Sequence, residues 1–132
     1  MHRIVARFQD GHMLKGFTSD FLPTKGTFHL FPSDSATGAK PTEVAVGELK
    51  ALFFVKTFEG NPSHEEPSDF PADQKSTGRR IRVIFKDGEI MSGTTQGFDR
   101  SRPGFFVVPV DSGSNNERCF VVTAATEKVA LI

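Results

Sequence analysis

The sequence has no tryptophan, no tyrosine and a single cysteine, and its charges cancel. Cys119 alone excludes both an internal disulfide and a zinc site built from a cysteine cluster. The 16 basic and 16 acidic residues give a formal net charge of zero, which argues against a protein that tracks phosphate backbones through a basic surface. No apolar run approaches the roughly 20 residues of a membrane helix, and the opening MHRIVARFQDG lacks the apolar stretch of a signal peptide. We therefore expect a globular, cytoplasmic protein that does not cross a membrane.

An internal repeat organises the 132 residues. RIVARFQDGHMLKGFTSDF at 3–21 matches RIRVIFKDGEIMSGTTQGF at 80–98, and the same shift of 77 residues continues without a gap to the C-terminus. Residues 3–55 and 80–132 share 13 identities over 53 aligned positions, including an F-x-D-G pattern, a following Gly and a late Pro. This fixed spacing predicts two copies of one structural unit.

The repeat divides the chain into repeat 1 (residues 1–56), a connector (57–78) and repeat 2 (79–132). Repeat 1 has 7 basic and 5 acidic residues (+2), repeat 2 has 8 and 6 (+2), and the connector has 1 and 5 (−4). The connector's proline, glycine and polar residues predict a linker. Its charge suits a strap that lies across the two basic repeats, or alternatively a lid that competes with an anionic ligand.

Each repeat has the pattern of a small all-β unit. Asp10-Gly11 and Asp87-Gly88 each lie between alternating apolar runs, which predicts a β-hairpin with a type I′ turn. Further strands are expected at 27–32, 42–46 and 51–55, and again 77 residues later, with a short helical turn before the last strand. Because five short strands leave exposed edges unless the sheet closes, we expect two tandem five-stranded barrels packed against each other.

Several strand residues are apolar on the face away from the expected barrel interior. The fifth strands, LFFV at 52–55 and VALI at 129–132, are apolar on both faces. Since a barrel has only one interior, such residues are candidates for packing between the barrels, for a homodimer interface, or for a peptide groove. The candidates are Phe31, Phe53, Phe106 and Val108.

Repeat 2 also carries a cluster of cations. The period of two along a strand places three of them on one strand face, and the others lie in loops or at a strand start. An anionic partner (RNA, a nucleotide or an acidic protein segment) is one interpretation, and ordinary solvated charge is the other. The cations are Arg80, Arg82, Lys86, Arg100, Arg102 and Arg118.

No pattern in the chain indicates catalysis. Cys119 begins an apolar strand and is expected to be a buried residue and not a nucleophile. The adjacent His64, Glu65 and Glu66 are awkwardly placed for tetrahedral coordination of a metal and are expected to be solvated. We therefore predict no catalytic residue, no cofactor and no metal site.

The segment from Phe85 to Asp99, FKDGEIMSGTTQGFD, resembles the first half of an Sm or LSm barrel, which is an SH3-like fold. The whole chain is similar to a family of uncharacterised bacterial proteins made of two such units. The Sm resemblance implies an RNA-binding rim at Phe98, Asp99, Arg100 and Arg102, with a later loop near Asn115, Asn116 and Arg118.

These observations leave two functional interpretations. The first is a non-catalytic protein-interaction or scaffold module, with a protein or a second copy as its partner. The alternative is RNA or nucleotide binding through the loop rim of repeat 2.

Overall fold

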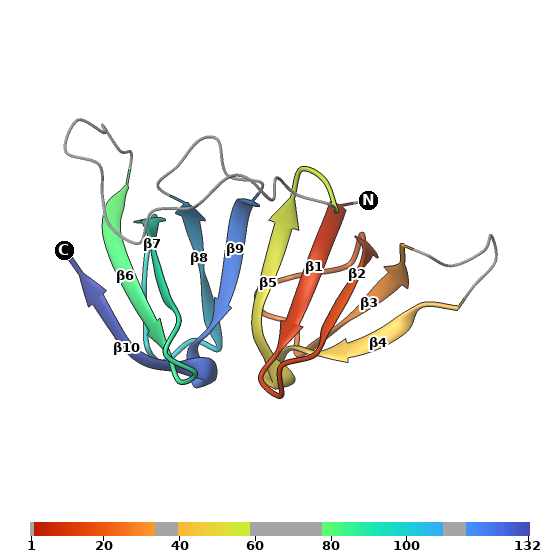
Figure 1. The fold of residues 1–132 in the computed structure, drawn as a ribbon, viewed down its shortest axis with the longest axis horizontal. Coiled ribbons are helices and arrows are strands. Elements are labelled where there is room, and N and C mark those ends of the chain that lie inside the picture. The colour runs from red at the N-terminus through yellow and green to blue at the C-terminus, as the bar shows by residue number, and fades with distance from the viewer. Residues whose placement is uncertain (1, 34–39, 59–77, 110–115) are drawn as a thin grey trace.

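The computed structural model describes residues 2–33, 40–58, 78–109 and 116–132 (Figure 1). The described residues form ten strands and two short 3₁₀ helices, one before the last strand of each repeat. Repeat 1 contains β1 (His2–Phe8), β2 (Met13–Thr18), β3 (Thr27–Pro32), β4 (Thr42–Ala45), η1 (Val46–Glu48) and β5 (Leu49–Val55). Repeat 2 contains β6 (Arg79–Phe85), β7 (Ile90–Thr95), β8 (Gly104–Pro109), β9 (Asn116–Val122), η2 (Thr123–Ala125) and β10 (Thr126–Leu131). The all-β prediction is confirmed.

The strands form one open antiparallel sheet in the order β10-β6-β7-β8-β9-β5-β1-β2-β3-β4, so the expectation of two closed barrels is wrong. Each repeat has the same internal strand order, but the two repeats are joined by pairing of β5 with β9. In this pairing Leu52 lies opposite Phe120 and Phe53 lies opposite Cys119. The physical reason is that β5 pairs both of its edges and buries both of its faces only if the sheet continues into repeat 2.

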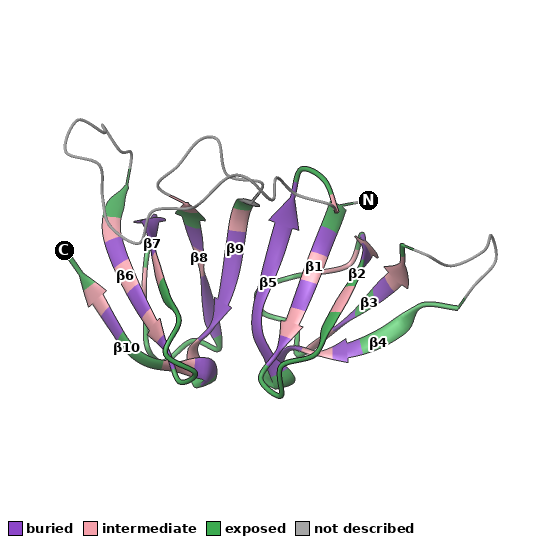
Figure 2. Cartoon of the chain, viewed as in Figure 1, coloured by how far each residue is buried: buried purple, intermediate pink, exposed green. Residues whose placement is uncertain are grey.

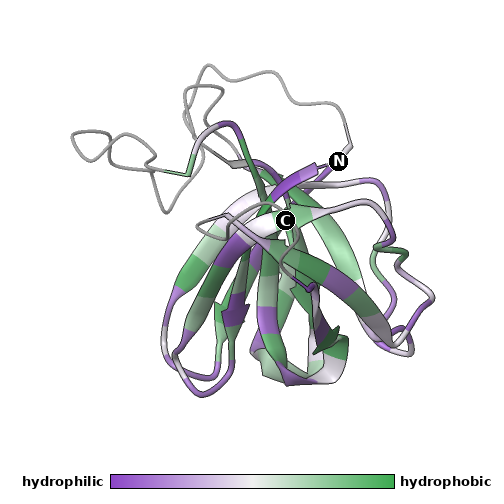
Figure 3. Cartoon of the chain, turned by 90° about the vertical axis from the view of Figure 1, so that its right-hand side faces the viewer, coloured by the Kyte–Doolittle hydropathy of each residue, from purple (hydrophilic) through white to green (hydrophobic). Residues whose placement is uncertain are grey.

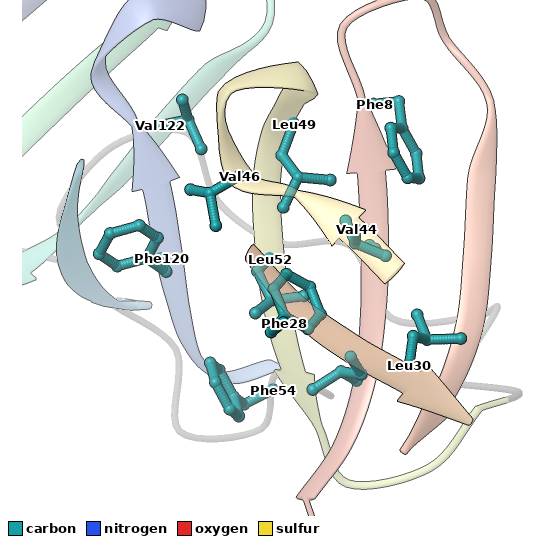
Figure 4. Close-up of a cluster of buried hydrophobic side chains, with 12 residues drawn as sticks. Phe8, Phe28, Leu30, Val44, Val46, Leu49, Leu52, Phe54, Phe120 and Val122 are labelled. Carbon is teal, nitrogen blue, oxygen red and sulfur yellow. The ribbon is translucent and has the colours of Figure 1, made fainter. Parts of the chain in front are cut away.

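The two central strands each supply side chains to two hydrophobic cores. Every residue of β5 is buried, and this strand is purple along its whole length in Figure 2. Because successive strand residues point to opposite faces, Leu52 enters the core of repeat 1 and Phe53 enters the core of repeat 2. In β9, Phe120 likewise packs in the core of repeat 1 and Val121 in the core of repeat 2. Figure 4 shows Phe120 and Val122 of β9 beside residues of repeat 1 such as Phe54 and Val46. Neither core is therefore complete without the other repeat.

The hairpins at the Asp-Gly pairs are present but use a different turn. Phe8 N–H donates to the His12 carbonyl at 3.0 Å and Gly11 N–H donates to the Phe8 carbonyl at 3.1 Å, and repeat 2 has the same pair of bonds. Among the described residues only glycines have positive φ, including Gly11 at 97° and Gly88 at 92°. The prediction of a type I′ turn is thus wrong, because that turn needs two such residues, whereas a three-residue loop ending in a glycine bulge needs one.

Glycine in the second strand of each repeat permits a close approach to the third strand. A Cβ on Gly93 would lie 2.3 Å from the Val108 carbonyl oxygen, and one on Gly16 would lie 2.2 Å from that of Phe31. The predicted core face of the third strands is confirmed, since Phe28, Leu30, Phe105 and Val107 are all buried. Hydrophilic and hydrophobic residues follow one another along the strands, as Figure 3 shows from the side of repeat 1.

The two strands that end the described sheet are less buried than the central pair. In β10 Val129 is buried, but Leu131 is 39% exposed and Ile132, just beyond the strand, is 60% exposed. The expectation that 129–132 is covered on both faces is therefore wrong, because β10 pairs only with β6. At the other end β4 has four residues and exposes Glu43. Short, charged edge strands resist pairing with further chains.

A buried lysine ties β5 to the first hairpin of repeat 2. The Lys50 side chain is only 10% exposed, and its Nζ lies 2.7 Å from Oδ2 of Asp87 and 2.9 Å from Oε1 of Glu89. It also lies 4.7 Å from the centroid of the Phe85 ring. The hydrogen bond from Lys50 lowers the pKa of Asp87 below its ordinary value. Lys50 therefore adds a polar contact between the repeats to the apolar contacts of β5 and β9.

Replacing Phe120 by alanine tests the shared core. We expect the Phe120→Ala variant to lose about 3–5 kcal/mol of unfolding free energy, because a fully buried ring is removed. Amide NMR signals of both repeats should disappear together at a lower urea concentration than in the wild type. The exposed Val108→Ala change is the control and should cost less than about 0.5 kcal/mol. Early loss of the signals from one repeat alone would contradict a shared core.

Replacing Lys50 and replacing its two carboxylate partners should change the free energy of unfolding by different amounts. Lys50→Met leaves two half-exposed carboxylates that water can solvate, so we expect a change in unfolding free energy below about 1 kcal/mol. The double change Asp87→Asn with Glu89→Gln leaves the buried ammonium without an anion and should cost about 3 kcal/mol. Urea denaturation at pH 7 measures both. Equal costs for the two variants would mean that burial of Lys50 has no energetic consequence.

Candidate functional site: the cleft between the repeats

An open cleft of about 1160 Å³ lies where the two repeats meet. Repeat 1 contributes Pro23 and Thr24 of the β2–β3 loop. Repeat 2 contributes the end of β7, the β7–β8 loop, β8 and β9. We call this feature the inter-repeat cleft. It is lined by Pro23 and Thr24, by residues 94–99 and 102–106, and by Val108, Arg118 and Phe120.

Aromatic rings and satisfied polar groups make up the walls of the inter-repeat cleft. The Phe98 and Phe105 rings meet edge to face at 4.7 Å, and Phe106 meets Phe120 at 5.2 Å. The Thr95 hydroxyl donates to the Phe106 carbonyl at 2.8 Å and accepts the Gly97 N–H at 3.3 Å. The cleft therefore offers mostly apolar surface, and the Thr95 hydroxyl is already hydrogen-bonded.

Asp99 is the one carboxylate among the described residues that line the inter-repeat cleft. The Ser101 hydroxyl donates to its Oδ1 at 2.7 Å and the Ser101 N–H donates to the same atom at 2.9 Å. These hydrogen bonds lower the pKa of Asp99 below its ordinary value, and the nearby positive charge of Arg102 acts in the same direction. Asp99 is therefore ionised at neutral pH and already has its partners.

The corresponding place in repeat 1 is occupied by a hydrogen-bonded acid–histidine pair. Oδ2 of Asp20 lies 2.7 Å from Nδ1 of His29, and Oδ1 accepts the His29 N–H at 2.9 Å and the Thr18 hydroxyl at 3.1 Å. The shift of 77 residues puts Gly97 at the position of Asp20 and Phe106 at the position of His29. Repeat 2 thus lacks both members of the pair, and its cleft is open where repeat 1 is bridged.

The structure separates the six predicted cations. Arg102 and Arg118 line the inter-repeat cleft. Arg80 and Arg82 lie on β6, which does not contribute to the cleft, and the exposed Lys86 follows that strand. Arg100 turns to the end of the sheet, where its Nη2 donates to the Val129 carbonyl at 3.3 Å. The cations are therefore not one patch.

The four predicted interface residues also fall in different places. Phe53 is buried in the core of repeat 2, and Phe106 of repeat 2 packs against the core of repeat 1. Both lie where the repeats meet within the chain. Phe31 is half-buried on β3 opposite Phe17, and Val108 is 49% exposed at the inter-repeat cleft.

Sequence reasoning missed Lys50 and the buried threonines of β7. The sequence predicts a strand over 51–55 with a short helical turn before it, whereas β5 begins at Leu49 and includes Lys50. The available signal is a lysine directly before the apolar run 51–55. Thr94 and Thr95 are buried at the cleft. Nothing in the sequence distinguishes these two threonines from other polar residues of a strand, so they could not be predicted as cleft residues.

The sequence offered one cysteine and one His-Glu-Glu run as candidates for catalysis or metal binding. Cys119 forms no disulfide, and it is fully buried. His64, Glu65 and Glu66 lie outside the described residues, as do Asn115 and the side chain of Asn116. Within the described ranges there is no group of three or more His, Cys, Asp or Glu that could hold a metal ion. In those ranges no helix has the length and apolarity needed to cross a membrane.

The Asp20–His29 pair should make part of the free energy of unfolding depend on pH. The hydrogen bonds from His29 and Thr18 lower the pKa of Asp20 from 3.8 to about 2. A carboxyl with a lowered folded-state pKa stabilises the fold above its unfolded value, and this contribution is lost as the pH falls through the folded value. The urea midpoint of the wild type should thus exceed that of Asp20→Asn above about pH 4 and converge with it toward about pH 2. Glu43→Gln, which removes another carboxylate of repeat 1, is the control. If the urea midpoint of the wild type still exceeds that of Asp20→Asn by the same amount at pH 2, the role of Asp20 is contradicted.

Comparison with known proteins identifies the family. Residues 1–132 match DUF6982, a family of unknown function. No curated protein and no solved structure matches the chain. The match extends over both repeats and the connector, and the chain therefore belongs to the DUF6982 family of unknown function.

Proposed function

We propose that this chain is a non-catalytic protein-interaction module that holds a peptide segment of a partner protein in the inter-repeat cleft. The observation that carries the proposal is the cleft itself, an open apolar hollow of about 1160 Å³ with walls from both repeats. Pockets for small molecules typically measure about 300–1000 Å³ and enclose their ligand, so a larger and open cleft suits a chain segment better.

One observation supports a binding role over a catalytic one. The thiol of Cys119 is fully buried, whereas a nucleophilic cysteine needs access to its substrate.

We propose the reducing cytoplasm of a bacterial cell as the site of action. A single cysteine that forms no disulfide suits that compartment.

Charge at the sheet ends favours a different protein over a second copy of this chain. The two strands that end the described sheet, β4 and β10, expose Glu43, Glu127 and Lys128. Pairing of two such edges would place charged side chains at the new junction. In contrast, the apolar residues predicted for a dimer include Phe53 and Phe106, which pack between the repeats of one chain.

RNA or nucleotide binding through the repeat 2 rim is the second candidate. The observation in its favour is that Phe98 and Arg102, both on the rim implied by the Sm resemblance, line the inter-repeat cleft. The proposal that each repeat is Sm-like is supported by the two hairpins and by the close approach of β7 to β8 at Gly93. A net charge of zero and the dispersal of the cations make a phosphate-tracking surface the weaker alternative.

Selection from a displayed library of random 12-residue peptides tests the proposal with the full chain as bait. We expect enriched peptides to bind the wild type and to lose binding in Val108→Asp, because Val108 is 49% exposed in the inter-repeat cleft. Ile90→Asp is the matched control, since Ile90 is 47% exposed on β7 outside the cleft. Calorimetric titration of synthetic peptides measures both.

Two results would contradict the proposal. One is that no peptide is enriched, or that both variants bind as the wild type does. The other is a salt-sensitive rise in solution mass, by light scattering, when a mixed RNA pool is added to the wild type, which would favour the RNA interpretation.

A further inference from the structure

Arg118 occupies an unusual position on β9. It lies opposite Phe54 of β5, it is only partly exposed, and its guanidinium carbon is 4.3 Å from the centroid of the Phe54 ring and 5.0 Å from that of Phe106. Contact with two aromatic rings stabilises a cation but also removes water from it. The ion pairs found among the described residues belong to other cations, namely Arg7, Lys50, His12 and His29. Arg118 is therefore a partly desolvated charge that can still accept an anionic partner.

Arg118 also lies between two hollows. On one side is the inter-repeat cleft, and on the other is a smaller hollow of about 350 Å³, which we call the N-terminal hollow. The N-terminal hollow adds Arg3 and His2, and Glu117 is the one carboxylate among the described residues that line it. Arg3 donates to the Lys56 carbonyl and lies 5.6 Å from the centroid of the Phe58 ring. Arg118 is the cation that the two hollows share, so its guanidinium is the place where a ligand in the cleft can present a negative charge.

The inter-repeat cleft provides the apolar half of the same site. Phe98, Phe106 and the exposed Val108 line it, next to Arg118. The positive charge of Arg102 is offset there by Asp99, whereas Arg118 lines the cleft and forms no ion pair with another described residue. A ligand that fits has an apolar side chain in the cleft and a single anionic group at Arg118.

Repeat 1 has no equivalent of this arrangement. Pro41 stands at the position of Arg118, and His29 stands at the position of Phe106. In addition, Asp20 is hydrogen-bonded to His29 in the space that is open in repeat 2. The ring–guanidinium–ring arrangement therefore forms at the junction, from Arg118 and Phe106 of repeat 2 and Phe54 of repeat 1, and is not a structural requirement of the repeated fold.

We infer that Arg118 is the specificity-determining residue for an acidic peptide segment, in which an Asp or Glu carboxylate lies close to an apolar side chain. The inference rests on the proposed function and adds the chemistry of the partner. A peptide fits better than a nucleic acid because the site presents one available cation beside an apolar wall, whereas a phosphate backbone requires a series of cations. A guanidinium can bind the carboxylate through two parallel hydrogen bonds, which a point charge cannot do.

The peptides enriched on the wild-type chain supply the probes. We expect them to contain an Asp or Glu within a few positions of an apolar residue. For an enriched peptide, changing that residue to its amide, or changing Arg118→Gln in the protein, should each weaken binding at least about tenfold. Once the peptide carries the amide, Arg118→Gln should cause little additional loss. Arg118→Lys should recover only part of the affinity.

Two controls separate a binding effect from a folding effect. Lys128→Gln removes an exposed cation of repeat 2 outside both hollows and should leave the affinity unchanged. The amide NMR spectrum of Arg118→Gln should keep the dispersion of the wild type.

The outcomes distinguish this inference from the proposed function. One outcome is that Val108→Asp weakens peptide binding while the acid and amide forms of a peptide bind equally well. In that case the proposed peptide-binding function is kept, and recognition of a carboxylate by Arg118 is refuted. Enrichment of basic or purely apolar peptides refutes it as well. If no peptide is enriched, or if the mixed RNA pool binds and Arg118→Gln abolishes that binding, both are overturned.

Discussion

Pairing of β5 with β9 is the contact on which the rest of the structure depends. Each of these strands has one neighbour in its own repeat and one in the other, and each sends alternate side chains into two cores. The apolar residues on both faces of β5 are buried only in this arrangement. The molecule is thus one cooperative unit made from two copies, and the cleft exists because the junction brings a loop of repeat 1 against β8 and β9.

The two copies have diverged where their environments differ. At the junction β9 places Phe120 in the core of repeat 1, whereas the equivalent residue of β4 is the exposed Glu43. Similarly, Ala51 of β5 is buried and its equivalent on β10 is the exposed Lys128. Apolar residues at the inner junction favour the pairing between the repeats, and charged residues on the outer strands disfavour the same pairing with a further chain.

Local features of the fold could be predicted from the sequence, and long-range ones could not. The repeat, the hairpins, the strand glycines and the core face of the third strands follow from spacing and from alternation over a few residues. Which edges pair is different, because any strand edge can bond to any other, so closure within a repeat and pairing between repeats fit the same pattern. The one indication was that 52–55 is apolar on both faces.

The candidate site was predictable only in part for the same reason. Arg102 and Arg118 were among the predicted cations, and Phe106 and Val108 among the predicted apolar residues. All four belong to repeat 2. The contribution of Pro23 and Thr24 to the cleft, and the contact of Arg118 with Phe54, depend on the pairing between the repeats. Lys50 was missed because its carboxylate partners are on the other repeat.

The shared cores are tested most directly by producing residues 1–56 and 79–132 as separate chains and recording their amide NMR spectra. If β5 and β9 complete both cores, neither chain alone gives the dispersed spectrum of a folded protein, and mixing the two restores the spectrum of the intact chain. A dispersed and stable spectrum from either repeat alone would contradict the shared-core arrangement.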